Sequence, residues 1–315
     1  MAAEEAAVTS VSLAVLEKRK VASTNAVTYE ADVVQPLRRT CMRYTVRISR
    51  TASPKRDHMD DLLKNKTAVV YGAGAIGSAV ARAFATAGAT VFVADHNAGA
   101  LRQFADTPIK TARVDVLDKG AVAAFVQSVA EQTGQVDISF CATSTHKPGG
   151  DQGAALAELS YEDFSMPLID YTKAHFHTTN AVSPYMIQQG SGVIMGITAI
   201  PSQMPFPYTA GFGPAWAAVE AFLRLVAAEL GPHGVRTVCL HSAGSDGAAD
   251  KTLVATTPEI EQRFAEWGQR WASRNLLGKA PTLEEVGHMA VFMASDLAGA
   301  TTATTISLNG GMISH

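Results

Sequence analysis

The sequence is poor in cysteine, with only Cys41, Cys141 and Cys239. An odd number without paired spacing argues against a disulfide framework. Cys141 and Cys239 fall in apolar, strand-like runs, so we expect both to be small buried hydrophobic residues in a reducing compartment. The sequence also lacks the ligand spacing of a metal site, so we expect no bound metal.

Long apolar runs and an excess of positive charge are absent as well. The apolar segment 193–200 is far shorter than the roughly 20 residues that a membrane-spanning helix needs. The formal net charge is −3, which argues against nucleic acid or an anionic membrane as a partner. The chain does have 47% hydrophobic residues, enough for a large core. We therefore expect a cytoplasmic globular protein whose substrate, if it has one, is a small molecule.

The first 58 residues differ from the rest in composition. They contain ten Lys or Arg and six Asp or Glu, without a clear hydrophobic period. The segment 38–56 is rich in Arg and free of acids, as in a transit peptide, but Glu4 and Glu5 at the start do not fit one. An upstream start assigned in error is a second explanation, because Met59 leads naturally into a first strand. We expect 1–58 to be a disordered or mis-assigned extension and 59–315 to be a single domain.

From Met59 onward, short apolar runs alternate with amphipathic segments. The runs predict strands at 67–71, 90–94, 112–116, 136–141, 192–197, 235–240 and 304–308. The amphipathic segments predict helices at about 76–84, 122–129, 167–188, 215–230, 258–273 and 286–293, the last preceded by a capping box of Thr282 and Glu285. Apolar strands separated by helices are typical of a parallel sheet covered on both faces. The predicted fold class is therefore α/β, a doubly wound parallel sheet of the Rossmann type.

A glycine-rich motif follows the first predicted strand and opens the first predicted helix. It reads Gly72-Ala73-Gly74-Ala75-Ile76-Gly77, the G-x-G-x-x-G pattern in its required context. Gly72 permits a tight turn, Gly74 lets the backbone approach a pyrophosphate, and Gly77 lets the helix pack on the strand. The helix N-terminus would supply free N–H groups for phosphate. The motif predicts a dinucleotide site, and a glycine turn without a ligand is the alternative.

Asp95 ends the second predicted strand, 23 residues after Gly72 (95 − 72 = 23). A carboxylate at this place binds the adenosine ribose hydroxyls and would repel a 2′-phosphate. The glycine loop contains no Lys or Arg, so we expect NAD to be favoured over NADP. The alternative is an aspartate that only caps a turn. Asp115 ends the third predicted strand, where a turn aspartate is the plain interpretation.

Residues 59–315 resemble the short-chain dehydrogenase/reductase family. The marks are the glycine loop, Asp95, VDISF and SGVIMGIT for two central strands, and AAELGPHGVRTVCLHSAG into the next. The closing EEVGHMAVFMASDLAGATTATTISLNGG also fits. The resemblance implies that Asp115 and Val116 contact the adenine. It also implies that the stretch after Gly244 lies near the nicotinamide and that 246–275 covers the substrate.

The family's catalytic residues are missing where the resemblance places them. The family uses an Asn, a Ser and a Tyr-x-x-x-Lys pair for proton transfer. Ala199 stands at the Ser position, Phe212 at the Tyr position, Trp216 at the Lys position and Tyr171 at the Asn position. Phe212 has no proton to give and Trp216 has no charge. General acid–base catalysis is typically worth ~10²–10⁴ in rate, so carbonyl reduction by the family's route should be nearly abolished.

Three residues could replace the lost groups: Tyr208, Tyr171 and His175. Tyr208 lies four residues before Phe212. Tyr171 and His175 stand at i and i+4 on one predicted helix and could face each other, and a histidine can relay protons near neutral pH. The plainer alternatives are a loop aromatic for Tyr208 and an interface or surface histidine for His175.

Two functional hypotheses remain open. The first is an NAD(H)-dependent oxidoreductase with an altered active site, because hydride transfer depends mainly on placing the nicotinamide against its acceptor. The second is a non-catalytic protein that holds NAD as a structural or sensing ligand. In either case we expect a homodimer or homotetramer. The segments 171–188 and 215–230 carry more apolar residues than one buried stripe needs, and the family pairs these helices between subunits.

Overall fold

The computed structural model describes residues 61–143, 152–243, 258–259, 261–263, 265–266 and 274–313. These residues belong to one compact unit that spans Asp57–His315. The predicted extension 1–58, Gly244 and most of the segment 246–275 lie outside the described residues, as does most of the helix predicted at 258–273.

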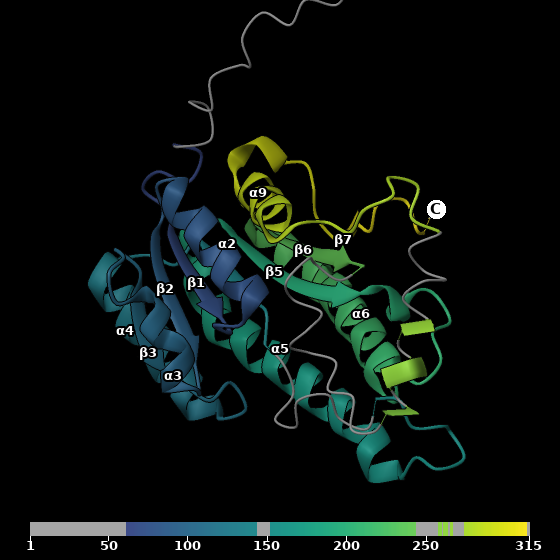
Figure 1. Cartoon of the computed structure of the whole chain (residues 1–315). Helices are drawn as coiled ribbons and strands as arrows, with labels where there is room; N and C mark the ends of the chain where they lie inside the picture. Colours follow the sequence, from purple (N-terminus) through teal and green to yellow (C-terminus); the bar gives the residue numbers. More distant parts are fainter. Residues whose placement is uncertain are drawn as a thin grey trace, which may run out of the picture. The chain divides into compact units, whose positions relative to one another are not determined.

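A seven-stranded parallel sheet forms the centre of this unit, in the order β3-β2-β1-β4-β5-β6-β7 (Figure 1). All six neighbouring pairs are parallel. The strands are β1 (Thr67–Tyr71), β2 (Thr90–Asp95), β3 (Lys110–Arg113), β4 (Ile138–Cys141), β5 (Gly192–Ala199), β6 (Val235–Ser242) and β7 (Thr304–Leu308). The strand order reverses between β1 and β4, and this confirms the predicted doubly wound sheet.

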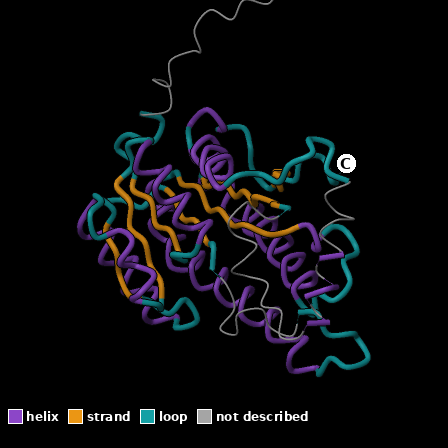
Figure 2. Tube along the Cα trace, viewed as in Figure 1, coloured by secondary structure: helices purple, strands orange, loops and turns teal. Residues whose placement is uncertain are grey.

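Helices cover both faces of the sheet, and Figure 2 shows the strands as one layer between them. One face packs against α2 (Ala75–Thr86) and α9 (Leu283–Ala294). The other packs against α4 (Lys119–Thr133), α5 (Tyr161–Gln189) and α6 (Phe212–Leu230). Each face buries its own apolar cluster, and this accounts for the strands that are apolar throughout.

Two of the boundaries that differ from the prediction have a clear local cause. Strand β3 ends at Arg113 rather than 116, because Asp115 turns the chain by accepting a hydrogen bond from the Leu117 amide at 2.9 Å. Helix α5 begins at Tyr161 rather than Pro167, because the Ser160 hydroxyl caps it by accepting from the Asp163 amide. Pro167 therefore lies inside the helix and does not start it.

The capping box at α9 is confirmed. The Thr282 hydroxyl accepts from the Glu285 amide at 3.1 Å, and the Glu285 carboxylate accepts from the Thr282 amide at 2.8 Å.

The C-terminal ends of the parallel strands lie together at one edge of the sheet. In an open α/β sheet the crevice at the reversal point on this edge is where ligands bind.

Candidate nucleotide-binding and active site

The glycine loop lies at the reversal point between β1 and β4, and its glycines differ in what surrounds them. Gly72 has φ +101°, and a Cβ there would lie 2.5 Å from the Ala142 carbonyl oxygen. At Gly77 a Cβ would lie 2.0 Å from the Gly72 carbonyl oxygen, so helix and turn pack too closely for any side chain. A Cβ at Gly74 would meet nothing within 4 Å. Gly74 is the residue that leaves open space beside the backbone.

Gly74 is also the N-cap of α2, and no side chain caps this helix. The first amide groups of a helix have no partner within the helix, so an uncapped start can bind an anion. Ile76, in the first turn, packs against the apolar cluster under α2 and anchors this end of the helix.

The Asp95 carboxylate lies beside the loop. One of its oxygens accepts from the Ala73 amide at 2.7 Å, and the other accepts from the Asn97 amide at 2.7 Å. The second contact is the turn-capping role considered for Asp95, and the first ties the glycine loop to the end of β2. The side chain is 13% exposed. Each carboxylate oxygen has two lone pairs, so further hydrogen bonds from a ligand remain open to it.

A pocket joins these parts at the C-terminal edge. Val116 and Asp115 form one wall, and the carbonyl of Val116 accepts from Nδ1 of the buried His177 at 3.0 Å. This contact joins the wall to α5, and no local sequence pattern predicts it. The pocket is lined by Gly72, Gly74, Ala94, Asp95, His96, Val114, Asp115, Val116, Leu117, Ala142 and Thr143.

Tyr171, Phe212 and Trp216, which the resemblance assigns to the family's Asn, Tyr and Lys positions, form one aromatic cluster. The Tyr171 ring meets those of Phe212 and Trp216 edge to face, with centroids 6.1 Å apart in each case. The Phe212 and Trp216 centroids are 5.5 Å apart. Tyr171 and Phe212 are buried. Neither Phe212 nor Trp216 carries an acid or a base, so of the three only the Tyr171 hydroxyl could exchange a proton.

Ala199 ends β5, and the turn that follows it is held by a buried acid. The Glu220 carboxylate on α6 accepts from the Thr198 hydroxyl at 2.8 Å, from the Ser202 hydroxyl and from the Gln203 amide at 3.0 Å. Glu220 is 5% exposed. Sequence reasoning missed this residue. The one sequence signal that could have pointed to Glu220 is an acidic residue within the apolar face of a predicted helix.

His175 is buried, so the expectation of an interface or surface histidine is wrong. The imidazole lies on Gly196 of β5, where a Cβ would come within 2.7 Å of its Cε1. Gly196 is paired with Cys141 of β4, so the imidazole lies beside the Cys141 thiol. Burial raises the pKa of that thiol, but the nearby charge and hydrogen bond of His175, with hydrogen bonds from Thr143, outweigh burial and lower it to about 7.

The two described cysteines therefore differ. Both are buried, as expected. Burial raises the pKa of the Cys239 thiol to about 12, so Cys239 fits the expected small hydrophobic residue. Cys141, with its polar partners, does not.

Tyr208 lies in a loop and has a left-handed backbone, with φ +61°. The Arg263 guanidinium carbon lies 4.9 Å from the centre of the Tyr208 ring. The Tyr208 backbone carbonyl accepts a hydrogen bond from the Gly153 amide at 2.7 Å. These contacts join the loop to the segments at 153 and 263, the role of a loop aromatic.

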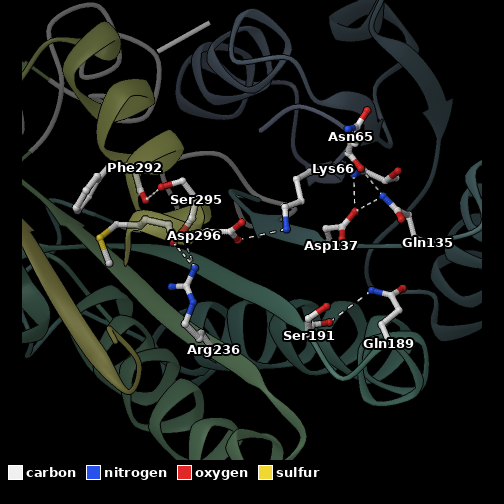
Figure 3. Close-up of polar contacts among 12 residues, drawn as sticks. Asn65, Lys66, Gln135, Asp137, Gln189, Ser191, Arg236, Phe292, Ser295 and Asp296 are labelled. Atoms are coloured by element: carbon white, nitrogen blue, oxygen red, sulfur yellow. Dashed lines mark hydrogen bonds and ion pairs between the residues drawn. The ribbon is translucent and has the colours of Figure 1, made fainter. Parts of the chain in front are cut away.

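A second cavity, of about 380 Å³, lies at the opposite, N-terminal edge of the sheet. Figure 3 shows its polar contacts. Lys66 pairs with Asp296 at 3.3 Å, and Asp137 accepts from the Gln135 amide at 2.8 Å. Arg236 donates to the carbonyls of Met293, Ser295 and Thr301. These contacts fasten the end of α9 to the sheet.

Metal and membrane features were sought in the part of the chain that the structure describes. Among those residues no group of three or more His, Cys, Asp and Glu could hold a metal ion. No described helix combines the length and apolarity required to cross a bilayer.

The sheet order and the glycine loop at its reversal point define the class of protein, a Rossmann-type nucleotide-binding fold. The family model described as enoyl-(acyl carrier protein) reductase matches residues 72–313. 7α-Hydroxysteroid dehydrogenase of Escherichia coli (strain K12) is 26% identical over 263 residues, which cover 79% of this chain and 94% of that protein. 3-Oxoacyl-(acyl-carrier-protein) reductase of Chlamydia trachomatis is 27% identical over 262 residues, which cover 81% and 100%.

A solved short-chain type dehydrogenase/reductase from Mycobacterium ulcerans has the same fold. Its TM-score is 0.68 at 22% identity, with 79% of this chain and 90% of that chain covered. The chain therefore belongs to the short-chain dehydrogenase/reductase family. The predicted family is confirmed, and with it an oxidoreductase relationship.

Proposed function

We propose that this chain is an oxidoreductase that uses NAD(H) and transfers hydride to or from a small molecule at an altered active site. The supporting observation is the Asp95 carboxylate, which is bonded to the glycine loop and lines the pocket beside Gly74. The open space at Gly74 and the uncapped start of α2 fit the pyrophosphate of a dinucleotide. The residues present therefore fit the cofactor. When bound, NAD(H) would supply or accept the hydride.

The preference for NAD follows from charge. An anionic carboxylate can accept hydrogen bonds from ribose hydroxyls, whereas it repels a 2′-phosphate. The nearby Arg113 side chain donates to the His96 carbonyl at 3.1 Å, so its guanidinium is partly engaged within the protein. Asp115 and Val116 would form the adenine wall of the same pocket.

The altered chemistry follows from the aromatic cluster. Phe212 and Trp216 cannot donate a proton or bias one, and Ala199 cannot orient a substrate oxygen. Tyr171 carries the one hydroxyl in that cluster, and a neutral phenol can donate a proton but is a poor base. Acceptors that need little acid assistance suit such a site better than simple ketones.

The alternative is a non-catalytic protein that holds NAD as a structural or sensing ligand. The close packing of Tyr171, Phe212 and Trp216 favours it, because these rings occupy the positions where the family's polar groups would act. On either hypothesis we propose a cytoplasmic homodimer or homotetramer without nucleic-acid or membrane partners.

Two measurements separate these functions. Calorimetry with NAD⁺, NADH and NADP⁺ should show binding of the first two and weaker binding of the third. NADH oxidation is then followed with diacetyl, an activated diketone, and with a simple ketone. Reduction of diacetyl with little reduction of the ketone supports the altered oxidoreductase. NADH binding without turnover of any acceptor supports the sensing protein, and robust ketone reduction would show that the catalytic positions were misassigned.

A further inference from the structure

Four residues stand in register across the centre of the sheet. Tyr71 of β1 pairs with Cys141 of β4, Cys141 pairs with Gly196 of β5, and Gly196 pairs with Cys239 of β6. Side chains of paired residues in a parallel sheet point to the same face. Tyr71 and Cys239 belong to the apolar cluster on the face covered by α4, α5 and α6, so this row faces those helices. Gly196 is the one position in the row without a side chain.

His175 of α5 fills the space that Gly196 leaves. Its Cε1 would lie 2.7 Å from a Cβ at that position, which puts the imidazole beside Cys141, the residue paired with Gly196 on the neighbouring strand. Cys141 and His175 are each 2% exposed. An imidazole and a thiol are thus held together inside the protein, at the last residue of β4.

Thr143 connects this buried pair to the pocket. Its hydroxyl oxygen lies 3.4 Å from the Cys141 sulfur, and Thr143 itself lines the pocket beside the glycine loop. The contacts form one continuous path: His175 imidazole, Cys141 thiol, Thr143 hydroxyl, pocket. No other described thiol has such a path, because Cys239 contacts the buried Thr198 hydroxyl at 3.4 Å.

The groups that face the pair from other elements do not compete for its proton. Tyr71 on β1 has a buried hydroxyl without a hydrogen-bond partner among the described residues, and burial with the nearby Cys141 raises its pKa. Tyr71 therefore stays neutral. On α6, the Glu220 carboxylate accepts from Thr198, Ser202 and Gln203 and acts on the turn after β5.

We propose that Cys141 and His175 form a buried acid–base pair that exchanges a proton with the substrate through the Thr143 hydroxyl. This rests on the proposed function as an NAD(H)-dependent oxidoreductase. In reduction, bound NADH would supply the hydride, and the substrate oxygen takes a proton from the Thr143 hydroxyl. Thr143 takes the proton of the Cys141 thiol, and the thiolate is held by the His175 imidazole. Water returns a proton after the product leaves, and oxidation of an alcohol runs through the same steps in reverse.

The pair suits this task because an acid–base group works best when its pKa is near the operating pH. A thiol with a pKa of about 7 is present in both protonation states near neutrality. In this scheme Thr143 touches the substrate, whereas Cys141 and His175 act through it.

The first test asks whether the pair exists, and it needs neither cofactor nor substrate. The ultraviolet absorbance of thiolate is recorded against pH for the full chain and for Cys141→Ser. Subtracting the Cys141→Ser curve from that of the full chain should leave one thiolate that titrates near pH 7. Cys239→Ser is the matched control and should retain this titration. His175→Gln should move the titration above that of an ordinary thiol, ~8.5, because burial then acts without the histidine. A Cys141 thiolate that forms only at the ordinary pH or above it would overturn the proposal.

The second test asks whether the path carries protons. With NADH and diacetyl, Cys141→Ser and Thr143→Val should each lower kcat by ~10²-fold and remove the ionisation near pH 7 from the kcat profile. Thr143→Val changes a partly exposed residue, so it covers the case in which the buried His175→Gln does not fold.

The outcomes separate this proposal from the proposed function. If NADH binds and diacetyl is reduced at an unchanged rate and pH profile by both variants, the relay is wrong and the oxidoreductase stands. If NADH binds but wild type does not reduce diacetyl, the relay is also wrong. If NADH does not bind at all, the proposed function is wrong, and the thiolate titration still decides whether the pair exists.

Discussion

The Asp95 carboxylate accepts a hydrogen bond from the Ala73 amide at 2.7 Å, so the end of β2 and the glycine loop are joined through one side chain. This contact gives Asp95 two roles, one in the shape of the loop and one toward a ribose.

Asp95→Asn is expected to separate the two roles. The amide oxygen can still accept from the Ala73 backbone, but the negative charge is gone. We expect NAD⁺ affinity to fall about tenfold, the loss of a charge-assisted hydrogen bond, and NADP⁺ affinity to rise. Calorimetry measures both. Asp106→Ala, at an exposed acid outside the pocket, is the control and should change neither. Tighter NADP⁺ than NAD⁺ binding by the unaltered protein would contradict the assignment.

The glycines of the loop should respond differently to the same methyl group. Gly77→Ala places a Cβ 2.0 Å from the Gly72 carbonyl oxygen, so it should lower the melting temperature by several degrees, as a loss of about 1–3 kcal/mol would. Gly74→Ala meets nothing within 4 Å and should leave melting nearly unchanged while weakening NAD⁺ binding. If Gly74→Ala binds NAD⁺ normally, the pyrophosphate does not approach the backbone there.

Glu220 should contribute to stability through its three hydrogen bonds. Glu220→Ala leaves three polar groups without their shared acceptor, and we expect the free energy of unfolding to fall by about 1–3 kcal/mol. Urea unfolding measures this. Glu229→Ala changes an exposed acid on the same helix and is the control. Equal stability of the two variants would show that the turn after β5 does not depend on Glu220.

Cys141 should make stability depend on pH in a defined direction. The pKa of the Cys141 thiol in the folded chain is about 7, below the ordinary 9.0. The stabilisation that the thiolate gives the folded state is therefore present in full above pH 9 and is lost as pH falls through 7. The free energy of unfolding should therefore rise between pH 7 and pH 9 by up to about 3 kcal/mol relative to Cys141→Ser. The Cys239 thiol has a raised pKa of about 12, so its effect on stability has the opposite sign. It lowers the free energy of unfolding, and only above pH 9. Parallel stability curves for wild type and Cys141→Ser would contradict this.

The outer faces of α5 and α6 should be the subunit interface. Phe176 and Leu225 are 51% and 62% exposed, and the Phe176 ring lies 6.3 Å from that of Phe222. Phe176→Glu should convert the oligomer to a monomer, because a charge buried between subunits is strongly unfavourable. Light scattering at micromolar concentration measures the mass. Leu297→Glu, in the 3-10 turn after α9, is the control. A monomeric wild-type protein would refute the interface.

Most of the fold could be predicted because its signals are local. A buried parallel strand is apolar throughout, and the capping box of Thr282 and Glu285 needs only four consecutive residues. The start of α5 was missed because Pro167 is typical of a first helical turn, whereas the cap at Ser160 lies seven residues earlier.

The polar part of the site could be predicted only where a motif carries it, as in the glycine loop and Asp95. The Cys141–His175 pair joins residues 34 positions apart (175 − 141 = 34), and the Glu220 contacts reach back to Thr198. Such pairs depend on strand register and on how a helix docks, which no local pattern reports. The surface or interface position predicted for His175 fails for the same reason, because the residue is buried.

Gly196 makes the position of an imidazole depend on the absence of one carbon atom. A methyl group there would come within 2.7 Å of the His175 ring and expel it from its place beside Cys141, while leaving every backbone pairing of β5 intact. Any side chain at position 196 therefore competes with the imidazole for the space beside Cys141. A relative with any side chain at the position of Gly196 can share this sheet, but it cannot share the pair.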